Sequence, residues 1–325
     1  MMTLASMPSD IEQAIYATVR YFNVLNCPVT ATQIWHSLVV DTSQQRWGGH
    51  EHWHLRHIQE TLKYSAWLKS RVGMKWGYVF LQGHEHLVRE RLTRHRTSQQ
   101  KWNIAFKAAK YLALVPFVRG LAGSGSLAAD NTKPDSDLDF FVITAPRRIW
   151  TARLLLLAVA SVLGRRRKHW YKRAPDMLCL NHYVSQQHLA LPTDIHNVYT
   201  AVLYTLLVPV YGAQVVRDFQ EKNASWISRY IMSYEAVVAP HRYTVRAHAL
   251  AVFLKRFVES LLLEPIGDGL EKLAEKFQRR LISIHSTGQA GRVALSSVEL
   301  AFHPDTKVPA LLAQYERDPQ QRSLL

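Results

Sequence analysis

The chain has 325 residues with a formal net charge of +15, and 48% of its residues are hydrophobic. This apolar content is enough to form packed cores and excludes an overall disordered chain, while the length allows two or three domains. Two distant cysteines exclude a disulfide framework. The longest apolar block, residues 154–163, is too short to span a bilayer, and the first 25 residues lack the pattern of a signal peptide. We therefore expect a cytoplasmic protein without a membrane partner.

The N-terminal part has the pattern of short helices followed by a hairpin. Capping boxes that begin at Ser9 and Thr30 predict two helix starts, and apolar spacing over residues 55–62 predicts a third short helix. Residues 67–81 predict a hairpin with Gly73 in its turn. This pattern resembles a winged helix, which binds DNA or RNA in some proteins and serves as a docking module or as scaffolding in others.

A long helix is predicted over residues 87–114. Apolar and basic side chains alternate there, and the first helix breaker is Pro116. We expect this helix to join two domains. Two interpretations of its basic face remain open, namely a solvated surface and a surface that follows a nucleic-acid backbone.

A glycine- and serine-rich turn follows the predicted strand 117–122. Its small residues leave room for backbone amides and hydroxyls to close around a polyphosphate, and they are Gly123, Ser124, Gly125 and Ser126. The next predicted strand begins with Asp137 and Asp139, which a period of two places on one face. Two such carboxylates repel each other unless a cation such as magnesium lies between them. A glycine-rich hairpin before a solvated acidic strand would give the same pattern.

The pair Gly125-Ser126, then about ten residues, then Asp137-Leu138-Asp139 between apolar residues, resembles the signature of the DNA polymerase β-like nucleotidyltransferase superfamily. The resemblance implies an α+β fold with a small mixed sheet flanked by helices. It implies that Asp137 and Asp139 are catalytic and hold Mg²⁺ or Mn²⁺. It also implies that Gly123 to Ser126 bind the phosphates of a nucleoside triphosphate substrate.

The excess of basic residues is greatest after the acidic strand. A helix is predicted from about Pro146 to Leu163, and it carries three arginines that we expect to assist phosphate binding, namely Arg147, Arg148 and Arg153. Basic residues then continue to Arg173. The segment 147–173 is either partly a solvated loop or a surface for the phosphates of a triphosphate or of an RNA or DNA acceptor.

The third carboxylate of the superfamily falls within the next strand, predicted over residues 177–184. The matching position in this chain is Asn181, which departs from the pattern. An amide can ligate magnesium weakly, but it cannot deprotonate an attacking hydroxyl. Asp176 and Asp194 are nearby substitutes, although Asp194 also suits the N-cap of the following helix.

We expect a helical C-terminal part that ends in a frayed tail of about twenty residues. The resemblance implies that this part closes over the nucleotide or holds the acceptor. Its aromatic residues, such as Trp226 and Phe253, could stack on a base or pack in a core. The predicted domains are residues 1–86 (winged-helix-like), 87–115 (connecting helix), 116–212 (nucleotidyltransferase) and 213–325 (helical).

Three functional hypotheses follow. The first is a magnesium-dependent nucleotidyltransferase that moves a nucleoside monophosphate to a hydroxyl acceptor, which could be RNA, a small molecule or a protein. The second is a catalytically impaired, nucleotide-sensing protein that binds nucleic acid, which the amide at Asn181 motivates. The third is a structural subunit whose partner supplies the missing acid.

Overall fold

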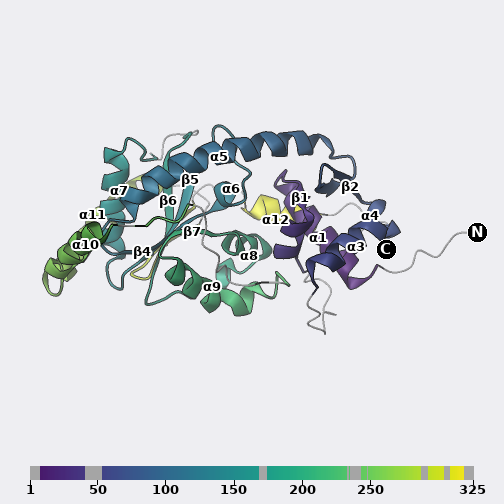
Figure 1. Cartoon of the computed structure of the whole chain (residues 1–325). Coiled ribbons are helices and arrows are strands. Elements are labelled where there is room, and N and C mark those ends of the chain that lie inside the picture. The colour runs from purple at the N-terminus through teal and green to yellow at the C-terminus, as the bar shows by residue number, and fades with distance from the viewer. Residues whose placement is uncertain are drawn as a thin grey trace, which may run out of the picture.

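The computed structural model describes residues 8–40, 53–167, 174–232, 234, 243–246, 248–286, 292–303 and 308–317. The molecule is elongated, with the N-terminal elements at one end and helices α10 and α11 at the other (Figure 1). Helix α5 runs along much of this length and connects the N-terminal elements to the central sheet (Figure 1).

The N-terminal elements are four helices around a three-stranded antiparallel sheet of order β1-β3-β2. Their bounds are α1 Asp10–Val24, β1 Val29–Thr30, α2 Ala31–His36, α3 Leu55–Tyr64, α4 Ala66–Lys69, β2 Val72–Lys75 and β3 Tyr78–Leu81. Both capping boxes are confirmed, because Ser9 and Glu12 cap α1 and Thr30 and Gln33 cap α2. The third short helix is also confirmed.

The hairpin turn differs from the prediction. It lies at Trp76-Gly77, where both residues have positive φ, and Gly73 is instead paired with Phe80 within the hairpin. A two-residue hairpin turn of this kind requires left-handed backbone at both positions, which glycine adopts readily. Gly73 is small for another reason, since a β-carbon there would collide with the ring of Phe80.

Helix α5, His86–Leu112, confirms the predicted long helix. Two of its basic side chains point inward and hold loops of the central domain. The Nζ atom of Lys101 lies 2.7 Å from a carboxylate oxygen of Asp176 and donates to the carbonyl of Ser136 at 2.7 Å. Arg91 donates to the carbonyl of Ala129 at 3.1 Å. Lys101 and Arg91 therefore have structural roles. Whether the other basic residues of α5 are merely solvated or follow a nucleic-acid backbone stays a prediction.

The central sheet has six strands in the order β7-β4-β5-β6-β9-β8. Strands β5 and β6 are parallel, and all other neighbours are antiparallel. The bounds are β4 Val118–Gly123, β5 Leu138–Thr144, β6 Leu178–Ser185, β7 Val208–Tyr211, β8 Arg292–Leu295 and β9 Glu299–His303. The mixed sheet with flanking helices confirms the α+β class.

Strands β7, β8 and β9 were not predicted, and the expectation that the C-terminal part is purely helical is wrong. β7 is a short edge strand that contains Pro209, and an edge position tolerates the missing amide of proline. β8 and β9 form a hairpin that extends the sheet beside β6. These strands are too short to give a periodic signal, and distant pairing stabilises them.

The remaining helices lie on the faces of the sheet and at its ends. They are α6 Gly125–Ala128, α7 Ile149–Val162, the 3₁₀ turn η1 Thr193–Ile195, α8 Val198–Thr205, α9 Ala213–Ile227, α10 Ala249–Leu261, α11 Ile266–Ser286 and α12 Val308–Glu316. Asn197, and not Asp194, is the N-cap of α8, because its side chain accepts from the amide of Thr200 at 3.0 Å. Residues 308–316 also correct the predicted frayed tail, because the ring of Tyr315 packs on Tyr21 of α1.

Two hydrophobic clusters lie on opposite faces of β5. Phe140 and Val142 belong to the cluster that includes α5 and α7. Phe141 and Ile143 belong to the cluster that includes α8, α9 and the N-terminal helices α1 to α3. The N-terminal elements therefore share a core with the helices of the central domain. Among the described residues, no helix combines the length and the apolar character needed to cross a bilayer.

Candidate functional site

Two carboxylates and a thiol converge at the start of β5. Asp137 directly precedes this strand, Asp139 is its second residue, and Cys179 lies opposite Asp139 on the parallel strand β6. One ligand atom from each of the three side chains lies within 4.8 Å of the others. Asp137 and Asp139 thus share a face, as the strand period predicts, and they form a site with a geometry that a cation could occupy.

The Gly-Ser turn lies directly against these acids. The amide of Ser124 donates to the carbonyl of Asp139 at 3.0 Å, and Gly125 has a left-handed backbone with φ of 58°. A β-carbon on Gly125 would lie 3.0 Å from Oδ2 of Asp139. Only a residue without a side chain fits this conformation and this approach comfortably. The predicted juxtaposition of the turn and the acids is therefore present, since Gly123 and Ser124 lead β4 into the turn that carries Gly125 and Ser126.

The environment of Asp139 opposes its ionisation. Burial raises the pKa of Asp139 to about 7, and the neighbouring charge of Asp137 adds to this rise. A hydrogen bond from the Cys179 thiol and the charge of Arg167 act in the opposite direction. Burial and the two carboxylates in turn raise the pKa of the Cys179 thiol well above its ordinary value. The thiol is therefore a neutral donor near physiological pH.

Arg167 supplies the positive charge at this site. Its guanidinium forms an ion pair with Asp137 and donates to the sulfur of Cys179 at 3.3 Å. Arg167 belongs to the predicted basic run, so this part of the run reaches the acids. Lys168 to Arg173 lie outside the described residues. An arginine in this position offsets the mutual repulsion of the two carboxylates when no metal ion is bound.

Asn181 lies two residues beyond Cys179 on β6. The register pairs Phe140 with Leu180 and Phe141 with His182, so Asn181 is the extra residue of a β-bulge. The residue opposite Asp139 is Cys179, which pairs with it before the bulge. A role for Asn181 in place of the third carboxylate stays a prediction.

The two substitute acids are placed differently. Asp176 lies next to the residue that precedes Asp137. Its amide donates to the carbonyl of Ser136, and its carboxylate pairs with Lys101. Asp194 belongs to the 3₁₀ turn before α8. The metal-ligand group found among the described residues contains Asp137, Asp139 and Cys179 but neither of these acids.

The three arginines of the α7 region lie beyond the opposite end of β5. The strand extends about 16 Å from Asp139 to Thr144 at the usual rise per residue, and the arginines follow that end. Arg147 pairs with Glu264 and Asp268, and Arg148 pairs with Asp268 at 2.7 Å. Arg153 is buried and donates to the side chain of Gln278 on α11. Closeness in sequence misled the prediction, because the strand carries these residues away from the acids and the C-terminal helices engage their charges.

Sequence reasoning did not single out Cys179 and Arg167. Cys179 carried a usable signal, since it shares the alternating face of a strand next to the acidic one, but only the parallel register identifies its partner. Arg167 was one of several consecutive cations. Comparisons of the chain with protein-family models, with curated proteins and with solved structures find no match.

Proposed function

We propose that this protein is a metal-dependent nucleotidyltransferase with a polymerase β-like catalytic domain. The observation that carries the proposal is the close approach of the glycine-serine turn to Asp139, through the amide of Ser124 and the backbone of Gly125, beside a pair of acids that could hold a metal ion. The mixed sheet, with Asp137 and Asp139 at the start of one strand and the turn at the end of its neighbour, supports this architecture. The order of the N-terminal helices and strands likewise supports a winged-helix-like domain.

The donor set fits a hard divalent cation. Asp137 and Asp139 supply carboxylate oxygens, which Mg²⁺ and Mn²⁺ prefer, and the phosphates of the substrate supply further oxygens. Bound there, the cation would neutralise the charge on the triphosphate. Cys179 remains a neutral hydrogen-bond donor in this arrangement, and Arg167 supplies a cation that can turn from Asp137 towards phosphate oxygens.

The proposed reaction is a displacement at the α-phosphorus of the triphosphate. The oxygen of an acceptor hydroxyl forms a bond to the α-phosphorus, and the bond from that phosphorus to the bridging oxygen breaks. Pyrophosphate leaves, and the hydroxyl proton passes to a carboxylate or to water. The backbone amides of Gly125 and Ser126 and the hydroxyls of Ser124 and Ser126 would hold the leaving phosphates, since the amide of Ser124 already donates to the carbonyl of Asp139. The acceptor is a hydroxyl compound, and RNA is one candidate.

Pyrophosphate release tests this proposal. We expect release from at least one ribonucleoside triphosphate with Mg²⁺ and a cellular extract that contains RNA and small molecules. The variant Asp137→Asn/Asp139→Asn should lose about 100-fold or more of this rate, because it loses the metal ligands. The control Asp135→Asn removes an exposed acid two residues before the pair and should keep the rate. Equal release by the double variant and wild type would overturn the proposal.

A second function is favoured by the thiol opposite Asp139. A neutral thiol at Cys179 and an amide at Asn181 leave β6 without an evident third carboxylate. The protein would then sense nucleotides and bind nucleic acid without turnover, through the N-terminal elements or through the basic segment 147–173. Mg²⁺-dependent triphosphate binding with no pyrophosphate release under any condition would favour this function.

A further inference from the structure

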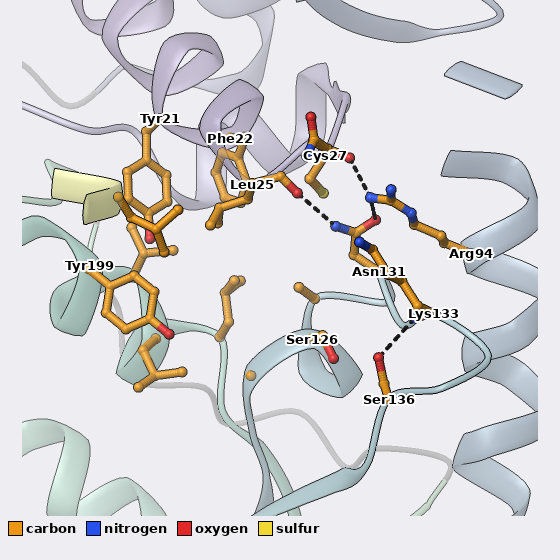
Figure 2. A pocket seen from close by; sticks show the side chains of 17 residues that line it. Tyr21, Phe22, Leu25, Cys27, Arg94, Ser126, Asn131, Lys133, Ser136 and Tyr199 are labelled. Atoms are coloured by element: carbon orange, nitrogen blue, oxygen red, sulfur yellow. Dashed lines mark hydrogen bonds between the residues drawn. The ribbon is translucent and has the colours of Figure 1, made fainter. Parts of the chain in front are cut away.

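A cavity of about 280 Å³ lies between the N-terminal elements and the catalytic sheet. Its walls come from α1, from α6 and the turn that follows it, and from α8 (Figure 2). Gly125 and Ser126 border it, and so does Ser136, the residue before Asp137. The cavity therefore opens onto the residues that flank both acids, and its volume is close to the lower limit of about 300 Å³ for small-molecule sites.

The walls of the cavity are largely aromatic and aliphatic. Tyr21 and Phe22 of α1 and Tyr199 of α8 lie on one side, while Ser126 and Lys133 lie across from them (Figure 2). Burial raises the pKa of the Tyr199 hydroxyl, and the charge of Asp139 adds to this rise, so that Tyr199 lies within electrostatic range of the acid site. The lining thus combines apolar and aromatic walls with the hydroxyl of Ser126 and the amine of Lys133.

The N-terminal wall is tied to the turn after α6. The side-chain amide of Asn131 donates to the carbonyl of Leu25 at 3.3 Å, and Arg94 donates to the carbonyl of Asn26 at 2.8 Å (Figure 2). Arg94 is also paired with Glu90 at 2.7 Å. The bonds of Asn131 and Arg94 hold the end of α1 over the Gly-Ser turn, so the cavity is built by contacts between residues that are 106 and 68 positions apart.

We infer, on the basis of the proposed function, that this cavity holds the base and ribose of the nucleoside triphosphate. Gly125 and Ser126 also border the cavity, so a triphosphate bound at these two residues would have its nucleoside beside the cavity. The ring of Tyr199 offers a face for stacking with a base, whereas the ring of Tyr21 is already packed against Phe22 and Tyr315 and contributes apolar wall. A volume of about 280 Å³ is comparable to the size of a single nucleoside. The N-terminal elements thus form part of the nucleotide site.

The sequence resemblance implies that the C-terminal part closes over the nucleotide. Of its helices, α12 contributes Leu311 to the lining of this cavity, and its Tyr315 packs on Tyr21. The lining includes no described residue of α10 or α11. Trp226 of α9 donates to Asn223 at 2.9 Å within the core, and Tyr230 donates to the carbonyl of His196 at 3.0 Å. Phe253 is exposed on α10, which lies at the far end of the molecule from α1 (Figure 1). The described aromatic residues of the C-terminal part are therefore either committed to packing or distant from α1.

The test compares Mg²⁺-dependent binding of each ribonucleoside triphosphate with binding of inorganic tripolyphosphate, by calorimetry. Wild type should bind at least one nucleoside triphosphate about tenfold or more tightly than tripolyphosphate. Leu203→Trp, which fills the cavity from α8, should remove this preference and leave tripolyphosphate binding unchanged. Leu250→Trp, at a leucine of α10 that is 70% exposed, is the matched control and should keep the preference. Retained tripolyphosphate binding reports an intact fold.

If Leu203→Trp unfolds the protein, Tyr199→Ala replaces it, since this change removes a wall of the cavity instead of filling it. A preference that survives at the cavity variant, or that is absent from wild type, overturns the inference and leaves the proposed function standing. If the cavity instead holds the acceptor, the cavity variant should keep its preference for the nucleoside triphosphate over tripolyphosphate. Binding of both polyphosphates that is unaffected by Asp137→Asn/Asp139→Asn instead contradicts the proposed function itself.

Discussion

At the scale of single residues, the ionised carboxylate of Asp139, which we propose as a metal ligand, destabilises the folded protein because it is buried. Burial and the charge of Asp137 raise its pKa from an ordinary value of 3.8 to about 7. Between these two values the folded protein binds more protons than the unfolded chain. The free energy of unfolding therefore falls as pH rises from about 4 to about 7. A cation between the two carboxylates, as proposed, would remove this penalty.

The variant Asp139→Asn should be more stable than wild type at pH 8 without metal, by on the order of 2 kcal/mol. The amide removes the unfavourable buried charge. At pH 3 the Asp139 carboxyl is largely protonated in both states, so most of the difference should disappear there, and at pH 4 only a small part of it should remain. Urea unfolding at pH 4 and pH 8 with a chelator measures it. Equal differences at pH 4 and pH 8 would contradict the shifted pKa of Asp139.

At the scale of elements, the turn between β4 and α6 depends on one glycine. Gly125 has a φ of 58°, and a β-carbon there would press on the carboxylate of Asp139. Gly164 after α7 has a similar φ of 65°, but a β-carbon there would meet no atom within 4 Å. The two positions share the backbone strain of a substitution and differ only in what surrounds them.

Gly125→Ala should therefore weaken Mg²⁺-dependent triphosphate binding by about tenfold or more, because the turn must move away from Asp139. Both substitutions should lower the free energy of unfolding by about 1 kcal/mol because of the left-handed backbone, but Gly164→Ala should leave binding unchanged. Calorimetric titration and thermal unfolding of both variants measure the two effects. Similar losses of binding in both would show that strain alone, and not the contact with Asp139, is responsible.

At the scale of the whole molecule, a buried lysine attaches α10 to the central domain. The Nζ atom of Lys255 donates to the carbonyls of Ala113 at 2.9 Å and Val118 at 2.6 Å. Burial lowers the pKa of Lys255 from 10.5 to about 8, and the charge of Glu259 partly opposes this change. The attachment is therefore strongest where the amine is neutral, since no buried charge remains.

The unfolded chain binds more protons than the folded protein between pH 8 and pH 10.5, so the contribution of Lys255 to stability rises with pH in this range. Relative to Lys255→Met, wild type should gain about 2 kcal/mol of unfolding free energy between pH 7 and pH 10. Urea unfolding of both proteins at both pH values measures this change, and other titrating groups cancel in the difference. Parallel pH curves would contradict the lowered pKa.

The sequence by itself determined the local features. Ser9 and Thr30 predict their helix starts because a capping box involves neighbours three residues apart. Asp137 and Asp139 share a face because a strand alternates. The glycine turn and the acids could be associated from spacing alone, and the structure places them in contact.

Only the tertiary structure decided which distant residues join them. The parallel register of β5 and β6 places Cys179 opposite Asp139, and register depends on pairing across the whole strand. Arg147, Arg148 and Arg153 lie beyond the far end of β5, whereas Arg167 returns to the acids. The cavity exists because α1 is held against the turn after α6 by bonds between segments far apart in the chain. Such contacts depend on packing between elements, which no local pattern encodes.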